Sequence, residues 1–215
     1  KPDQLLTEVA RQLALAMAYE DTIRVAELKI RASRFERVRK EVIVKDGQLL
    51  DIVEYMHPRT QEIAETLPAG LGRFILNTGW VRGIVDAFTK KGRKVKTSSI
   101  RGFLLLYTVA SLKSWRPKSL RYPEEQKRVE GWLDRIAEIA PKDYALAVEL
   151  AHVIGMVKGY GETHERGRER YEALMAMLPK LMARGKAAKD VATLRKAAAA
   201  DESGEAFKKA VAAIA

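Results

Sequence analysis

Apolar residues recur at helical spacing along most of the chain. Four of them lie four positions apart and so share one face of a predicted opening helix: Leu5, Val9, Leu13 and Met17. A second run covers residues 23–30, and Ser33-x-x-Glu36 has the form of a capping box, which predicts a helix start at Ser33. The periodicity and its Pro and Gly punctuation predict further helices over residues 59–66, 69–77, 81–89, 98–114, 123–139, 143–158 and 163–184.

Strand signals are weak. Residues 41–44 (EVIV) form the only credible strand, with residues 48–55 as a conceivable partner. Neither segment alternates cleanly between apolar and polar positions, so we favour helix or loop for both. Gly79 is predicted to end one helix before the next begins.

The pattern also predicts how the domain is divided. Residues 90–96 (KKGRKVK) carry five cations in seven residues and interrupt the periodicity, which indicates a solvated loop and a possible subdivision near residues 90–97. Residues 186–215 are rich in Ala and Lys and offer few large apolar side chains to bury. We therefore predict an all-α fold, an irregular multi-helix bundle of about 8–10 helices. Residues 1–185 form one helical domain, and residues 186–215 form a loosely docked helical extension.

Composition and the length of the apolar runs add four constraints. Of 215 residues, 47% are hydrophobic and 31% charged, which is enough for a sizeable core, and the net charge of +11 favours anionic partners. The lack of cysteine excludes disulfides, thiolate zinc sites, iron–sulfur ligation and a Cys nucleophile. The most apolar stretch, residues 103–112, is about half the length of a membrane-spanning helix, so we interpret it as a core segment. We expect a cytoplasmic protein and, from the Lys1 start, a fragment of a longer polypeptide.

The densest run of functional residue types is GYGETHERG at residues 159–167. Glycines let a ligand approach the backbone, and a helix start favours anions, so its candidate ligand residues are Gly159, Gly161, His164 and Arg166. The favoured alternative is a plain connection in which Gly159 ends one helix and Thr163 caps the next. A dinucleotide fingerprint is excluded because His164 stands where that motif needs Gly.

A second cluster lies at residues 55–62. His57 is predicted to cap a helix on which Arg59 and Glu62 lie one turn apart. One hypothesis has these residues, with Arg73, meet His164 and Arg166 around a pocket for an anion such as a CoA phosphate or a carboxylate. We assign no metal and no catalytic residue, because the chain holds three His, none in the H-E-x-x-H spacing. His152 is predicted to be a hydrogen-bonded core residue.

Other catalytic and binding signatures are missing. The sequence contains neither a Gly-x-Ser-x-Gly elbow nor a P-loop, so we expect no catalysis by this chain alone. Residues 90–96 offer phosphate contacts, but the nearest aromatic residues, Phe88 and Phe103, fall in the flanking helices. A solvated loop is therefore favoured there over a nucleic-acid site.

Four runs are distinctive in combination: MAYEDTIRVAELKIRASRFERVRKEV (residues 17–42), EYMHPRTQEIAETLPAGLGRFI (54–75), SLRYPEEQKRVEGWLDRI (119–136) and GYGETHERGRERYE (159–172). Together they resemble the helical region of the beta-type (B) subunit of bacterial indolepyruvate ferredoxin oxidoreductase, a member of the 2-oxoacid:ferredoxin oxidoreductase family. The resemblance spans about residues 17–184 and leaves the Ala/Lys-rich tail uncovered.

The resemblance implies a thiamine-diphosphate enzyme that decarboxylates arylpyruvates oxidatively, makes the aryl-acetyl-CoA and reduces ferredoxin. It implies that thiamine diphosphate and the iron–sulfur clusters lie on a partner alpha-type subunit, and that a 2-oxoacid oxidoreductase domain of the same chain lies outside these residues. No cofactor is expected in this segment. We predict an accessory helical domain, inactive alone, that supports subunit assembly or covers the active site. The alternative is a basic helical module that binds nucleic acid or another anion.

Overall fold

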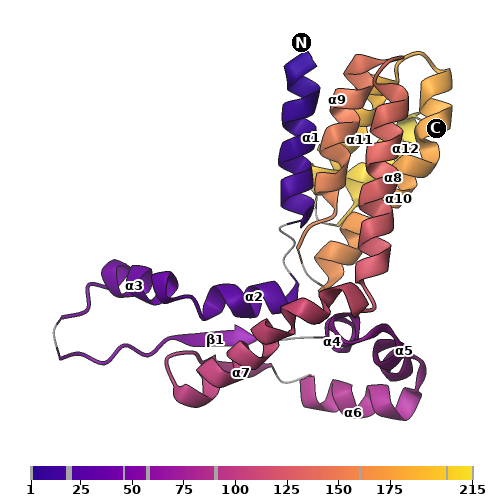
Figure 1. Cartoon of the computed structure of the whole chain (residues 1–215). Helices are drawn as coiled ribbons and strands as arrows, with labels where there is room; N and C mark the ends of the chain where they lie inside the picture. The colour runs from indigo at the N-terminus through magenta and orange to yellow at the C-terminus, as the bar shows by residue number, and fades with distance from the viewer. Residues whose placement is uncertain are drawn as a thin grey trace. The chain divides into compact units, whose positions relative to one another are not determined.

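The computed structural model describes residues 2–17, 21–45, 47–56, 59–89, 92–159, 161–201 and 203–214. These residues form twelve α-helices, two 3-10 helices and one two-stranded sheet, so the predicted all-α class is confirmed (Figure 1). They divide into two compact units. Unit 1 comprises Lys1–Tyr19 and Gln126–Ala215, and unit 2 comprises Glu20–Glu125. Among the described residues, no helix is both long and apolar enough to cross a membrane.

Unit 1 holds most of the buried apolar side chains. Its helices are α1 (Pro2–Met17), α8 (Tyr122–Ile139, whose first turn belongs to unit 2), α9 (Tyr144–Val153), η2 (Ile154–Met156), α10 (Gly161–Ala183), α11 (Ala187–Ala200) and α12 (Glu205–Ile214). Helix α9 packs between α1 and α11 (Figure 1). As its sparse polar content predicts, α9 is the central helix, with Leu146, Leu150 and Val153 fully buried.

The core of unit 1 confirms the predicted amphipathic start of the chain for three of its four apolar residues, whereas the fourth, Met17, is 70% exposed. Leu5, Val9 and Leu13 of α1 pack against the core cluster. At its centre the fully buried Trp132 donates its indole N–H to the carbonyl of Leu150 at 2.8 Å. A buried indole must find such an acceptor because an unpaired N–H in an apolar interior is costly.

The C-terminal helices are docked more firmly than their composition predicts. Val191 and Leu194 of α11 are fully buried in the core of unit 1, and Phe207 of α12 is buried with them. The expectation of loose docking was wrong because a few large side chains, spaced on one face, are enough to anchor an Ala-rich helix.

Unit 2 contains the shorter elements. They are α2 (Thr22–Lys29), α3 (Ala32–Glu41), β1 (Val53–Met56), α4 (Thr60–Thr66), α5 (Ala69–Asn77), α6 (Gly79–Thr89), β2 (Arg93–Lys96), α7 (Ile100–Ser111) and η1 (Leu112–Lys118). Helix α2 packs on α7, and α5 packs on α4 and α6. The small core cluster consists of Ala26, Val95 and Leu106, with partly buried residues around it.

The cationic segment near residue 93 is a strand, which corrects the predicted solvated loop. β2 pairs antiparallel with β1, Val53 opposite Lys96 and Met56 opposite Arg93. Val95 faces the core of unit 2 and is buried, while Lys94 and Lys96 on either side of it are exposed. Exposed and buried side chains therefore alternate along β2, as they do in a half-buried strand. The alternation was hard to see in the sequence because Val95 is the one apolar residue among the charged ones. Residues 90 and 91 lie outside the described residues.

Two predicted helix boundaries also differ. Helix α3 begins at Ala32 with Arg31 as its N-cap, and no side chain caps it, so the predicted Ser33–Glu36 capping box does not form. Gly79 is the first residue of α6 rather than a stop, and the break between α5 and α6 falls at Thr78. Both motifs are compatible with several positions relative to a helix end, so a sequence pattern alone does not fix the boundary residue.

Candidate functional site

The segment at residues 159–167 is a glycine turn followed by a helix start. Gly159 and Gly161 have φ values of +78° and +53°, in the left-handed region that favours glycine. Tyr160, between them, lies outside the described residues. The turn joins η2 to α10, so the favoured connection is present, but α10 begins at Gly161 and Thr163 lies inside it rather than at its cap.

A third glycine of this segment is required by packing. A Cβ atom at Gly167 would lie 2.3 Å from the carbonyl oxygen of Met156, far inside contact distance. Gly167 therefore lets α10 pass directly against the backbone of η2. The sequence marked this glycine only as part of a ligand-binding candidate.

The arginines on α10 have acidic partners on their own helix. Arg166 lies 3.5 Å from Glu162 and 3.5 Å from the hydroxyl of Thr163. Arg168 pairs with Glu165 and, at 3.0 Å, with Glu172. The hydrogen bond from Arg168 lowers the pKa of Glu165, and the same contact raises the pKa of Arg168. These pairs at i, i+3 and i, i+4 stabilise the helix surface.

The second predicted cluster, at residues 55–62, lies where helix α4 begins. His57 lies outside the described residues. The backbone N–H of Arg59, the N-cap of α4, lies 3.4 Å from the carboxylate of Glu62 that accepts it. Arg73 is exposed on α5, and its Nε donates to the carbonyl of Ala69 at 3.3 Å. Glu62 therefore acts as a capping residue in this structure.

The residues of the predicted anion pocket fall in different units. Arg59, Glu62 and Arg73 belong to unit 2, and the group in unit 1 consists of Gly159, Gly161, His164 and Arg166. Their convergence around one pocket stays a prediction.

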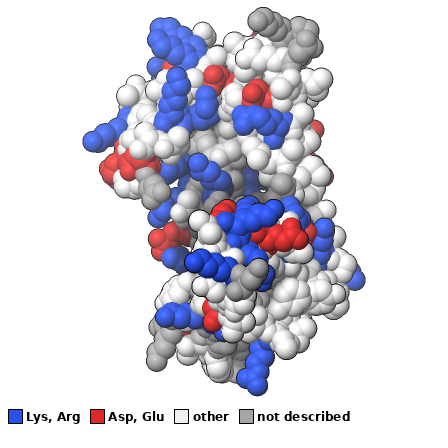
Figure 2. Space-filling view, turned by 90° about the vertical axis from the view of Figure 1, so that its left-hand side faces the viewer, with Lys and Arg blue, Asp and Glu red and all other residues white. Residues whose placement is uncertain are grey.

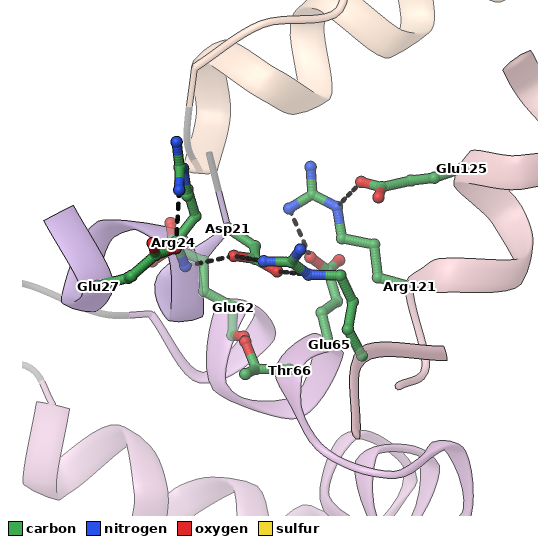
Figure 3. A network of polar contacts seen from close by, with 9 residues as sticks. Asp21, Arg24, Glu27, Glu62, Glu65, Thr66, Arg121 and Glu125 are labelled. Carbon is green, nitrogen blue, oxygen red and sulfur yellow. Dashed lines mark hydrogen bonds and ion pairs between the residues drawn. The ribbon is translucent and has the colours of Figure 1, made fainter. Parts of the chain in front are cut away.

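A polar network ties together segments of unit 2 that are distant in sequence (Figure 3). The carboxylate of Asp21 caps α2 by accepting the backbone N–H of Arg24 at 2.6 Å. It also accepts two hydrogen bonds from the guanidinium of Arg116 in η1, at 2.6 and 2.8 Å. The sequence offered no signal for this pair because 95 positions separate the two residues.

The other carboxylates of this network are neutralised in the same way. Arg121 contacts Glu65 of α4 at 3.5 Å and also pairs with Glu125 (Figure 3). Glu27 accepts from Arg31 and Arg24, and these hydrogen bonds lower its pKa to about 2. A carboxylate held ionised by arginine is a poor general acid or base near neutral pH. These paired carboxylates connect segments of unit 2 that are distant in sequence.

His152 of α9 is only partly buried, so its predicted place in the core was wrong, but it does have an acidic neighbour. Its Nδ1 lies 3.4 Å from the carboxylate of Glu8 on α1. The pKa of Glu8 is lowered chiefly by a hydrogen bond from Arg11 and further by His152. Within the described part of the chain, no group of three or more His, Cys, Asp or Glu residues is placed to hold a metal ion.

The exposed apolar surface of unit 2 is the feature that sequence reasoning missed. Trp80, Ile84 and Phe88 follow one another at four-residue spacing on α6, and all three are exposed. Leu71 and Phe74 of the adjoining α5 are exposed as well. We call these five side chains the α5–α6 face. Their helical spacing was visible in the sequence, but such spacing usually indicates burial.

A groove of about 480 Å³ lies elsewhere on unit 2. It is lined by Phe35 and Arg39 of α3, by Gln48, Leu49, Leu50 and Ile52, by Thr97, Ser98 and Ser99, and by Ile100, Phe103 and Leu104 of α7. We call it the α3–α7 groove.

The exposure of α7 corrects the interpretation of residues 103–112 as a core segment. Leu106 is buried, whereas Leu104, Leu105 and Tyr107 are exposed, because α7 packs on α2 along one face only.

The positive charge is concentrated in unit 2. Its sequence holds 21 Lys and Arg against 13 Asp and Glu, a net charge of +8 out of the total of +11. On the face seen in Figure 2, Lys and Arg side chains are interleaved with uncharged and acidic ones. An extended phosphate backbone is best met by a continuous basic stripe, and that face does not present one.

The geometry thus defines a helical protein with one well-packed unit and one unit that exposes apolar and basic surface. The sequence model of a family of unknown function, DUF6537, matches residues 1–177. Because this match covers most of the chain, the protein belongs to that family. No curated protein and no solved structure matches the chain.

Proposed function

We propose that this chain is an accessory docking domain of an arylpyruvate (indolepyruvate) ferredoxin oxidoreductase, inactive alone. In this proposal, unit 2 supports assembly with the thiamine-diphosphate-binding subunit or covers the active-site entrance. Thiamine diphosphate, the iron–sulfur clusters and CoA belong to the rest of the enzyme. The link to this enzyme rests on the resemblance of residues 17–184, and the docking role rests on the surface of unit 2.

One observation carries the docking role. Among the described residues, unit 1 contributes 17 of the 24 buried hydrophobic residues, whereas unit 2 contributes 15 of the 19 large hydrophobic residues that are exposed. Exposed large apolar side chains are unfavourable in water, and where they gather on one surface they are typical of interaction sites. Tryptophan and phenylalanine, which the α5–α6 face exposes, are also enriched at protein interfaces.

The polar groups support a non-catalytic role. The carboxylates of the Asp21–Arg116 and Arg121–Glu125 network are paired with arginine, and Glu62 caps α4. The arginines Arg166 and Arg168 are paired along α10. Each of these groups has a structural contact that accounts for it, which favours a structural over an acid–base role for them.

The test uses the full-length subunit that contains this region, together with the thiamine-diphosphate partner. We expect the double variant Ile84→Asp/Phe88→Asp to reduce recovery of the complex about tenfold or more, since it places charge in an apolar contact. Indolepyruvate-dependent ferredoxin reduction should fall with it. The matched control is Leu6→Asp/Leu15→Asp, which changes two exposed leucines of α1 in unit 1 and should leave both readouts unchanged.

Two results would overturn the proposal. One is normal assembly and turnover in an enzyme from which this region has been deleted. The other is decarboxylation of indolepyruvate by the isolated 215-residue chain, since that would require a catalytic site of its own.

A further inference from the structure

The α3–α7 groove is too open to hold a small molecule as an enclosed pocket would. Leu49 on its wall is 99% exposed, and Ile100 at its edge is 81% exposed. Pockets for small ligands enclose most of the ligand surface, roughly 70–90%. A groove whose apolar wall stands in water fits apolar side chains that project from a larger partner, because the partner's main chain can cover the exposed edges.

The hydroxyl groups of the groove are already used by the protein. Thr97 donates to the carbonyl of Ile52 at 3.2 Å, and Ser98 accepts the backbone N–H of Ile52 at 3.1 Å. Ser99 caps α7 by accepting the N–H of Gly102, and it donates to the carbonyl of Lys96. These contacts hold the wall in shape and leave apolar contact as the main attraction.

The charges around the groove select an acidic partner. Arg39 is its only charged lining residue, and no ion pair of Arg39 is found among the described residues. Among the carboxylates near the groove in sequence, Asp51 pairs with Lys96 at 2.7 Å, Glu54 pairs with Arg34 and Lys29, and Glu41 lies 3.8 Å from Arg37, while Glu36 next to Phe35 is exposed. Lys40 and Arg101, the sequence neighbours of Arg39 and Ile100, add exposed positive charge. Carboxylates on a partner would meet uncompensated cations here.

We propose that the α3–α7 groove binds a polypeptide segment of a partner protein whose large apolar side chains are flanked by Asp and Glu. This inference rests on the proposed docking role of unit 2 and adds the chemistry of the segment that docks there. The apolar side chains pack on Phe35, Leu50 and Leu104, and a carboxylate pairs with Arg39.

The test is selection of a phage-displayed library of random dodecapeptides against the purified chain at near-physiological salt. Enriched peptides should combine large apolar residues with net negative charge. For the best synthetic peptide, Leu104→Asp and Arg39→Glu should each weaken binding about tenfold or more.

Two variants serve as matched controls. Leu105 is 52% exposed on the same helix, against 54% for Leu104, but it does not line the groove. Arg82 is exposed on α6. Leu105→Asp and Arg82→Glu should change affinity less than about twofold, since surface changes outside a contact have small effects. Hydrogen exchange of the unmodified chain should slow at residues 97–104 when the peptide is added.

Several outcomes would overturn the inference. They are enrichment of neutral or basic peptides, no enrichment at all, equal binding by the Leu104→Asp variant, and unchanged exchange at residues 97–104. Displacement of the peptide by a DNA duplex or by phosphatidylserine vesicles would instead assign the groove to that partner.

The groove inference and the proposed function can fail separately. If peptides select the groove but deletion of the region leaves oxidoreductase turnover normal, the proposed function fails and the groove inference stands. If deletion abolishes assembly but no peptide is selected, the groove inference fails and the proposed function stands.

Discussion

The glycines of this chain differ in what an added methyl group would meet. Gly131, in the middle of α8, has open space around the position of a Cβ atom. Gly167, in α10, has a backbone carbonyl 2.3 Å from that position. Both lie within helices, so any difference between them comes from packing. At the residue scale, their contacts therefore separate a structural glycine from a replaceable one.

This contrast gives a prediction for Gly167→Ala. The methyl group would force α10 away from the carbonyl of Met156, and we expect a loss of about 2 kcal/mol in the free energy of unfolding. In the control Gly131→Ala, the better helix propensity of alanine should add about 0.8 kcal/mol. Urea unfolding of both variants measures the difference. Equal stability of Gly167→Ala and the unmodified protein would contradict the close approach.

At the scale of elements, unit 2 is joined by ion pairs as much as by apolar packing. Its core cluster is small, and α3 and α6 contain no buried residue. The pair between Asp21 and Arg116 instead connects the start of α2 to η1 with two charge-assisted hydrogen bonds. Asp21 also caps α2, so one side chain serves two elements.

Substitution of Asp21 tests this double role. Asp21→Ala removes the cap and leaves Arg116 without its partner, and we expect unfolding to become easier by about 2 kcal/mol. Asp21→Asn keeps an oxygen that can cap α2 and should cost about half as much. As a control, Asp51→Ala removes the exposed ion pair with Lys96 and should cost less than about 0.5 kcal/mol. Thermal and urea unfolding measure all three, and equal losses would argue against the double role.

At the scale of the whole molecule, apolar burial is distributed unevenly. The central helix α9 of unit 1 lies within the main hydrophobic core, while α3 and α6 of unit 2 contain no fully buried side chain. Local stability follows burial, because an element with few buried contacts can open without unfolding the rest. In the proposed docking role, a partner that covers unit 2 would stabilise it.

Hydrogen exchange of the isolated chain should show this difference directly. We expect the amides of α9 to exchange slowest and those of α3 and α6 to exchange at least about a hundredfold faster, because their opening costs less free energy. Mass spectrometry of peptides from the three helices gives the comparison within one sample. Similar protection in α6 and α9 would mean that the exposed face of α6 does not weaken it.

Part of the candidate site could be predicted from the sequence. The glycine turn near residue 160 and the existence of a helix start near residue 60 were predicted, since both depend on residues close together in the chain, although the N-cap is Arg59 rather than the predicted His57. The α3–α7 groove could not be predicted, because its lining comes from positions between 35 and 104 that only folding brings together. The same holds for Asp21 and Arg116.

The sequence by itself determined where most helices lie. Residues 69–77 were predicted as a helix and form α5 with those bounds, because the spacing of apolar residues on a helix is a local property. Only the tertiary structure decided which apolar faces are covered. Leu106 is buried and Leu104 is exposed on the same helix, and Val95 makes a strand of a cationic segment. Burial depends on which other elements pack nearby. The pattern of apolar residues in the sequence does not say which elements these are, because only the folded chain brings them together.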